Sequence, residues 1–302
     1  MGKDLYYTYV KLHVIVLIFG FTAILGKLIT LPALELVWYR MLIAVLTFYI
    51  YLKITRENLA VSRAVLLKLL GVGVIIAVHW VTFYGAIKLS NVSVALGCFA
   101  TTALFTSFLE PLFYRKRIIL AEVLIGLIII IGLYLIFRFE TRYLAGILVA
   151  LLSAFLAGLF SVLNKKLVAN HRAVKISFYE MIGGVIALSI FLALSGKGTS
   201  VPFLFPTWTD LFYLILLGTV CTAFAHTVQV DVMQHLTAYI VTLTINLEPV
   251  YGIILAFFIF GETERMTAGF YIGTLIILLS VIGFPIMQHY LFKRKRRISQ
   301  TD

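Results

Sequence analysis

The stretch TAYIVTLTINLEPVYGIILAFFIF, residues 237–260, decides the fold class of this chain. A helix that crosses the hydrocarbon core of a bilayer needs about 20 mostly apolar residues, and this stretch is long enough. Glu248 is its one charged residue, and Pro249 follows directly. Because backbone polar groups in lipid must be satisfied internally, the stretch predicts a membrane-spanning helix rather than an open sheet.

Nine further apolar runs of similar length flank this stretch. The short connections between them leave no room for a soluble domain. The sequence therefore predicts an all-α integral membrane protein, whose first run is a retained helix and not a cleaved signal peptide. The ten predicted spans are 12–30, 35–53, 66–87, 92–113, 118–137, 144–164, 174–195, 208–229, 237–260 and 267–291.

Composition agrees with this class. Hydrophobic residues make up 62% of the 302 residues and charged residues only 13%, with a mean hydropathy of +1.06; soluble domains are about 25% charged. The net charge of +12 sits in short basic segments between apolar runs and in the tail 293–297. That distribution indicates membrane topology and argues against a nucleic-acid partner. Cys98 and Cys221 lie inside apolar runs, so we expect buried free thiols.

Lysine and arginine set the expected orientation. With the N-terminus in the cytoplasm, 18 of these residues fall on the inner side and 6 on the outer side, and only Arg40 lies within a span. Positive residues favour the cytoplasmic side of a membrane protein. Both termini are therefore predicted to be cytoplasmic.

The chain also contains an internal repeat. At an offset of 147 residues Gly71 aligns with Gly218 and His79 with His226, and at an offset of 140 the segment 39–41 aligns with 179–181. Several coincidences at one offset indicate a duplicated unit. Its two copies are residues 1–139 and 140–302, with five predicted helices each.

An odd number of helices makes the second copy enter the membrane from the opposite side. The loops agree, since the basic segment 115–117 corresponds to the acidic 262–264. Inverted repeats around a midplane site are a recurrent transporter architecture.

These features resemble the EamA family of the drug/metabolite transporter superfamily. The resemblance rests on the segments 38–40, 247–249 and 261–262 and covers nearly the whole chain. It implies bacterial inner-membrane exporters of amino acids and related metabolites. It also implies a central cavity lined by helices 1–4 and 6–9, with helices 5 and 10 outside. The first half departs from the pattern, because Thr102 and the pair 114–115 stand where the second half has Pro249 and 261–262.

Ionisable groups inside spans are costly and mark candidate functional sites. Glu248 lies near the middle of its span, where a carboxylate could bind a substrate amine or carry a proton; a structural hydrogen bond is the alternative. His79 and His226 suit hydrogen bonding to a substrate or, for His79, proton coupling, with helix packing as the alternative. Two histidines without a third ligand make a poor metal site, so no metal and no cofactor are expected.

Arg40 and Glu180 are matched by the repeat but predicted to lie at opposite ends of their helices, too far apart to pair. Arg40 is a candidate for a substrate carboxylate or a cavity mouth, with snorkelling to the interface as the alternative. Glu180 is expected to snorkel to the inner interface. Glu110 is expected to pair locally with the Arg115 cluster. Further candidates for the cavity are Trp80, Tyr84, Tyr179, Tyr251, Thr101, Thr102, Asn246 and Gln229.

Taken together, the sequence predicts a secondary transporter that moves small metabolites by alternating access and exports amino acids or related amphipathic solutes. A proton-coupled exporter of toxic compounds or drugs is the alternative. A channel is disfavoured, and the chain is not expected to be an enzyme, since it has neither HExxH nor GxSxG. We expect a monomer or weak homodimer in the bacterial inner membrane. Substrate identity, direction and coupling stay open.

Overall fold

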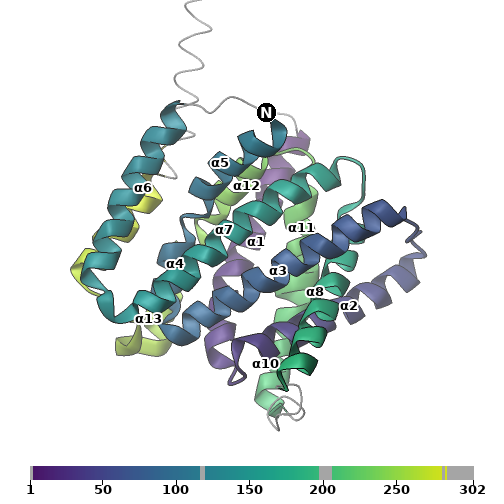
Figure 1. Cartoon of the computed structure of the whole chain (residues 1–302), viewed down its shortest axis with the longest axis horizontal. Helices are drawn as coiled ribbons and strands as arrows, with labels where there is room; N and C mark the ends of the chain where they lie inside the picture. Colours follow the sequence, from purple (N-terminus) through teal and green to yellow (C-terminus); the bar gives the residue numbers. More distant parts are fainter. Residues whose placement is uncertain (1–2, 116–119, 197–205, 281–282, 284–302) are drawn as a thin grey trace, which may run out of the picture.

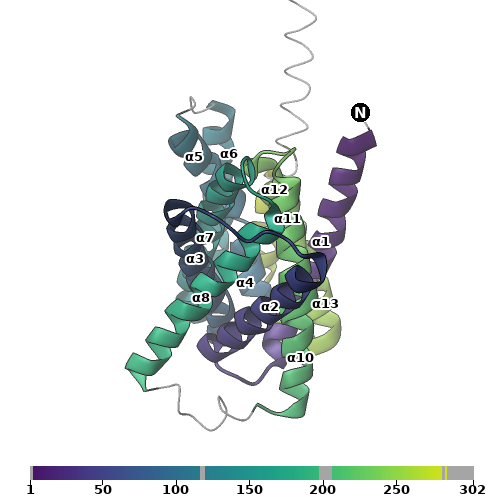
Figure 2. The ribbon, with the colours of Figure 1, turned by 90° about the vertical axis from the view of Figure 1, so that its right-hand side faces the viewer.

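The described residues of the computed structural model, 3–115, 120–196, 206–280 and 283, form helices joined by short loops, and no strand occurs among them. Figure 1 shows α3 crossing the bundle obliquely and α6 standing at one edge, and Figure 2 shows the same bundle from the side. The helices are α1 (Lys3–Leu28), α2 (Ala33–Thr55), α3 (Arg63–Leu89), α4 (Val92–Phe99), α5 (Thr102–Tyr114), α6 (Leu120–Phe139), α7 (Leu144–Val168), α8 (Ala173–Ser195), α10 (Trp208–Gly218), α11 (Ala225–Val232), α12 (Ala238–Ile245) and α13 (Glu248–Phe260).

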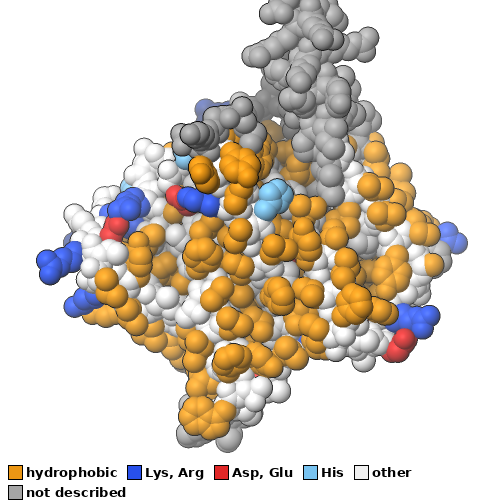
Figure 3. All heavy atoms as spheres, turned by 180° about the vertical axis from the view of Figure 1, so that it is seen from behind, with side chains coloured by type: hydrophobic (Ala, Val, Ile, Leu, Met, Phe, Trp, Pro, Cys, Tyr) orange, Lys and Arg blue, Asp and Glu red, His pale blue; other side chains and the backbone are white. Residues whose placement is uncertain are grey.

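Eight segments of the described chain are long and apolar enough to cross a membrane. They correspond to eight of the ten predicted spans. The predicted spans 118–137 and 267–291 lie partly outside the described residues, and their described parts contain the shorter apolar helices Leu127–Ile136 and Ala268–Ser280. Hydrophobic side chains cover the middle of the face in Figure 3, with charged side chains mainly toward its margins. The count of ten helices stays a prediction.

Contacts between loops sort the helix ends into two groups. At one end of the bundle the contacts join Lys27 to Glu264, Thr30 to Asp210 and Asn91 to Thr263. At the other end they join Lys11 to Asp231, Glu57 to Arg172 and Lys165 to Met233. The chain therefore traverses the bundle repeatedly from end to end, as a multi-pass membrane protein does.

Two predicted spans are interrupted in the middle, which corrects the expectation of continuous helices over 92–113 and 237–260. The first breaks between α4 and α5 at residues 100–101, and the second between α12 and α13 at residues 246–247. The Asn246 side-chain amide donates to the Ala100 carbonyl at 2.7 Å, so one break supplies a partner for the other. The breaks lie 146 residues apart, within one residue of the predicted repeat offset of 147.

A third irregularity lies between α10 and α11. Residues Thr219–Phe224 form a π-helical segment, so the predicted helix 208–229 is not regular either. π segments of this kind are rare and frequently mark functional sites.

Buried carboxylates hold the first halves of both broken helices. Glu264 accepts hydrogen bonds from the backbone N–H groups of Val92 at 3.1 Å and Ser93 at 2.8 Å, at the start of α4. Glu110 accepts the Tyr239 N–H at 2.9 Å, at the start of α12 and the opposite end of the bundle. A negative charge at a helix N-terminus satisfies orphan donors and opposes the helix dipole favourably.

Helices α3 and α8 touch along a seam of glycines. A Cβ on Gly73 would lie 2.0 Å from the Glu180 carbonyl oxygen, and one on Gly183 would lie 2.3 Å from that of Leu70. Small residues let membrane helices approach closely in this way. A similar contact between Gly132 and Gly273 joins α6 to the helix Ala268–Ser280.

The seam yields a matched pair of variants on one helix. We expect Gly73→Ala to destabilise the protein by roughly 1–3 kcal/mol, because the added methyl overlaps the α8 backbone. Gly71→Ala is the control, since a Cβ there meets nothing within 4 Å and helix propensity favours alanine by about 1 kcal/mol. Thermal unfolding in detergent, followed by intrinsic fluorescence, measures both. Equal melting temperatures for the two variants would refute the seam.

Candidate functional site

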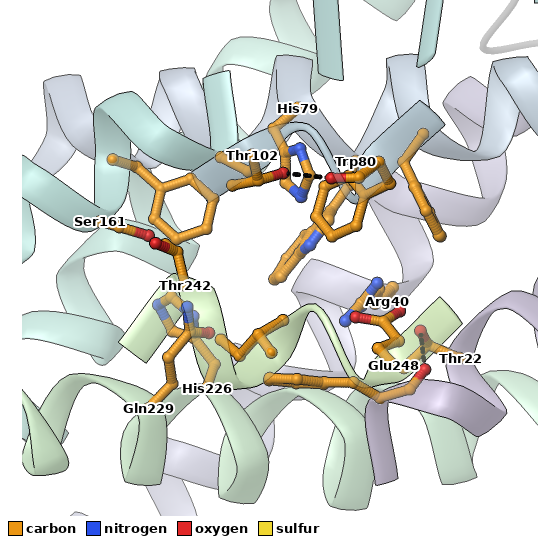
Figure 4. A pocket seen from close by; sticks show the side chains of 16 residues that line it. Thr22, Arg40, His79, Trp80, Thr102, Ser161, His226, Gln229, Thr242 and Glu248 are labelled. Atoms are coloured by element: carbon orange, nitrogen blue, oxygen red, sulfur yellow. Dashed lines mark hydrogen bonds between the residues drawn. The ribbon is translucent and has the colours of Figure 1, made fainter. Parts of the chain in front are cut away.

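A small cavity, lined by apolar and polar side chains together, lies where the two broken helices meet. Its volume is about 60 Å³, room for only a few water molecules at roughly 10–15 Å³ each. Its walls come from α1, α2, α3, α4, α5, α7, α11, α12 and α13 (Figure 4). The lining residues are Phe19, Thr22, Arg40, His79, Trp80, Phe83, Phe99, Thr102, Ala157, Phe160, Ser161, His226, Gln229, Thr242, Ile245 and Glu248.

Arg40 is held rigidly on one side of this cavity. Its Nε donates to Thr222 Oγ1 at 2.6 Å and its Nη1 to the Tyr84 hydroxyl at 2.7 Å. The guanidinium also lies 3.8 Å from the centre of the Trp80 ring, a cation–π contact. Thr222 belongs to the π segment, and its hydroxyl donates in turn to the Leu217 carbonyl, five residues earlier. The irregular turn therefore helps to place a fixed positive charge in the bundle interior.

Glu248 faces the same cavity from the first residue of α13. Its side chain is only 4% exposed, and its carboxylate has no hydrogen bond or ion pair with any other residue that the structure describes. Figure 4 shows the Arg40 and Glu248 side chains at the same end of the cavity, where their opposite charges attract. A buried carboxylate with free acceptors is a ready partner for a cationic or hydrogen-bond-donating ligand.

His79 sits in an aromatic box. Its Nδ1 lies 2.9 Å from the Ser153 carbonyl oxygen. Its ring stacks on Phe99 at 5.7 Å between centroids and lies 5.3 Å from Phe160. With Nδ1 engaged, Nε2 is the ring nitrogen left to meet a ligand.

His226, the repeat partner of His79, has a different environment. Its Nε2 lies 3.0 Å from Glu180 Oε2, and Asn164 Nδ2 lies 3.4 Å from the same oxygen. The prediction that Glu180 snorkels to the interface is wrong, since its side chain is fully buried. The physical reason is the glycine seam, which presses the α8 backbone against Gly73 and turns Glu180 inward.

The structure brings six of the predicted site residues to the cavity wall, and they come from five helices. These six are Glu248, His79, Trp80, His226, Arg40 and Thr102. Of the further candidates, Gln229 also lines it, whereas Tyr179 bonds the Leu59 carbonyl at one end of the bundle.

Four predicted residues lie outside the lining. Tyr84 stands behind Arg40, Thr101 bonds the Cys98 carbonyl, and Asn246 joins the two breaks. Tyr251 is 38% exposed. Tyr251 is three residues from Glu248, and this spacing turns its side chain about 60° around the helix from that of Glu248. The Cβ of Tyr251 faces Gly20 of α1 instead.

Sequence reasoning missed Thr22, Ser161 and Thr242, which complete the polar lining. Each is a small hydroxyl residue in an apolar run, which was the available signal. Such residues are common in membrane helices because they bond their own backbone, as Thr22 does with the Phe19 carbonyl. Among the described residues no group of three or more His, Cys, Asp or Glu side chains could hold a metal, and Cys98 and Cys221 are buried free thiols.

Comparison with known proteins assigns this architecture. The profile of the EamA-like transporter family matches the chain in two segments, residues 8–138 and 144–284. An uncharacterized transporter of Clostridium kluyveri is 24% identical over 66% of this chain, a match that spans 65% of its own length. The pseudopaline exporter CntI of Pseudomonas aeruginosa is 30% identical over 65% of this chain and 70% of its own length. A crystal structure at 15% identity has a TM-score of 0.67, covers 91% of this chain and 96% of its own, and shows the same fold.

Arg40 can be tested without any substrate. We expect Arg40→Lys to lower the melting temperature and change the emission of Trp80, because a lysine ammonium lacks the planar fork that serves Thr222, Tyr84 and the indole ring together. Lys53→Met, on the exposed face of the same helix, is the control. Thermal unfolding and fluorescence spectra in detergent measure both effects. An Arg40→Lys protein indistinguishable from the parent would show that the network is dispensable.

Proposed function

Because the chain belongs to the EamA-like transporter family, we propose that it is a secondary transporter that exports amino acids or related amphipathic solutes through the cavity around Glu248. The observation that carries the proposal is the buried Glu248 carboxylate, which has no partner among the described residues and lies beside the fixed Arg40 guanidinium. Such a pair suits a zwitterion, whose ammonium group meets Glu248 and whose carboxylate lies toward Arg40. Aromatic walls from Trp80, Phe99 and Phe160 suit an apolar side chain.

Family membership and the relatives named as transporters indicate a transporter rather than an enzyme. Export is supported by the relative named as an exporter. The substrate class is our inference from the cavity alone. The second candidate is a proton-coupled exporter of toxic compounds, with Glu248 and His79 as the predicted coupling residues.

We propose alternating access as the mechanism. The cavity of about 60 Å³ is smaller than an amino acid, so transport requires it to widen toward one end of the bundle at a time. Widening requires breaking contacts at one end only, and the two ends are held by separate groups, Glu264 with Lys27 at one and Glu110 with the Tyr239 N–H at the other. A channel needs no such alternation.

The proposed topology has ten helices in two inverted halves, residues 1–139 and 140–302, with both termini in the cytoplasm of a bacterial inner-membrane protein. Three observations support it: the two matches to the family profile, the two breaks within one residue of the repeat offset, and the sorting of loop contacts to two ends. The protomer carries a complete cavity, which fits a monomer or weak homodimer in the bilayer.

Reconstitution in liposomes tests the function. Radiolabelled L-phenylalanine, L-methionine and dipeptides are offered as probes, and we expect saturable counterflow of at least one. Glu248→Gln should reduce the counterflow rate by roughly tenfold or more, since a charge-assisted hydrogen bond is worth about 1.5–3 kcal/mol. Glu262→Gln, an exposed acid in the loop after α13, is the matched control and should stay within twofold of wild type.

Two outcomes would contradict the proposal. Flux without counterflow would indicate a channel. Wild-type counterflow in Glu248→Gln, His79→Ala and Trp80→Ala alike would remove the cavity from the substrate path.

A further inference from the structure

We infer that Glu180 and His226 form the proton-binding site that couples transport to a proton gradient, in place of Glu248 and His79. The inference rests on the proposed transport function for its consequence, but the site is argued from its own geometry. Glu180 and His226 lie on α8 and α11 and meet at 3.0 Å in the bundle interior, with side-chain exposures of 0% and 2%.

The surroundings of Glu180 contain one ionisable partner and unused hydrogen-bonding capacity. Its Oε2 contacts His226 and Asn164, while Oε1 is buried without a hydrogen-bond partner among the described residues. The Oδ1 of Asn164 and the hydroxyl of Ser177 on α8 are likewise buried without partners. A buried charge is tolerated only when it is compensated, so the state of His226 decides whether this carboxylate is stable.

The elements packed against the pair supply few other charges. Helix α2 contributes Arg40, whose donors are engaged by Thr222, Tyr84 and the Cys221 carbonyl. Helix α3 contributes His79, which is bonded to Ser153. Helix α7 contributes the neutral Asn164, and the ammonium of the adjacent Lys165 reaches the Met233 carbonyl. Glu248 of α13 lies at the Arg40 end of the cavity (Figure 4).

His226 connects this pair to the cavity. Its Nε2 faces Glu180, while the ring lines the cavity and stands edge-on to Trp80 at 6.1 Å between centroids. Uptake of one proton from cavity water converts a neutral imidazole beside a carboxylate into an imidazolium–carboxylate pair. The net charge of the pair changes from −1 to 0, and release of the proton restores it.

The two predicted coupling residues fit this role less well. Glu248 makes no hydrogen bond or ion pair with another described residue, so a proton there neither forms nor breaks a pair within the protein. His79 is boxed by three phenylalanines and has no carboxylate in contact. Among the ion pairs of the described residues, only Glu180–His226 has both side chains buried.

Coupling follows from repulsion within the cavity. An imidazolium at His226, together with Arg40, disfavours a substrate ammonium in the same small volume. Substrate binding and proton binding therefore oppose each other, and by linkage the antagonism is reciprocal. That is the arrangement an exporter needs to exchange one solute for one proton.

Tryptophan fluorescence tests the site without any substrate. The chain has three tryptophans, and a Trp38→Phe/Trp208→Phe parent in nanodiscs leaves Trp80 as the reporter, since a protonated imidazole quenches indole emission more than a neutral one. We expect a single pH transition that disappears in His226→Gln. In Glu180→Gln the midpoint should move by at least tenfold in proton concentration. A transition that survives both variants, or that is lost in Glu248→Gln instead, overturns the inference.

Proteoliposomes test the coupling, with radiolabelled L-phenylalanine as the probe, or L-methionine if phenylalanine shows no counterflow. We expect Glu180→Gln, whose side chain is not part of the cavity lining, to keep counterflow at equal pH within threefold of wild type. We expect both Glu180→Gln and His226→Gln to lose the acceleration caused by a gradient of one pH unit. A gradient response retained by either variant overturns the inference, as does a wild-type protein that ignores the gradient. Counterflow lost together with the melting temperature in both variants would show a structural role and equally overturn it. Failure of wild-type counterflow with every probe would count against the proposed function, while the fluorescence titration still decides the site.

Discussion

The structure depends on satisfying backbone groups where two helices are interrupted within the membrane. A break inside lipid exposes carbonyl and N–H groups that have no water to bond. The Asn246 amide donates a hydrogen bond to the Ala100 carbonyl, and the hydroxyls of Thr101 and Thr102 donate to the carbonyls of Cys98 and Phe99. Because Asn246 at one break satisfies a backbone carbonyl at the other, the two breaks must lie together, and the cavity forms beside them.

The same constraint orders the charges. Starting α13 at residue 248 places a carboxylate at the N-terminus of a half-helix inside the bundle, where the helix dipole favours it. Glu264 and Glu110 stabilise the N-termini of α4 and α12 in the same way, but they lie at the two ends of the bundle rather than at its centre. The interior cation Arg40 is equally constrained, since its Nε donates to Thr222 of the π segment.

Much of this was predictable from the sequence, because the bilayer imposes simple rules on apolar length and buried charge. The eight described spans follow from hydropathy, and Glu248, Arg40, His79 and His226 stand out as ionisable groups within spans. The breaks were not predictable, because a run such as 237–260 has the composition of a continuous helix on both sides of Asn246.

Tertiary contacts account for the other differences. Glu180 looked like an interfacial residue from its place in the chain, and only the packing of Gly73 against its own carbonyl turns it inward. Tyr251 lies three residues after Glu248, a spacing that suggested a shared helix face. The direction of its side chain nevertheless depends on where α13 starts and on its contact with α1. In each case the deciding partner comes from a helix distant in sequence.

The glycine seam between α3 and α8 also bears on the proposed alternating access. Where backbone meets backbone there are no side-chain rotamers to absorb sliding, and packed interfaces of this kind shift as units. In the proposed cycle α3 and α8 would therefore move together and carry Trp80, His79 and Glu180 with them. His226 belongs to α11, so a movement of α3 and α8 relative to α11 would change the 3.0 Å separation between His226 and Glu180.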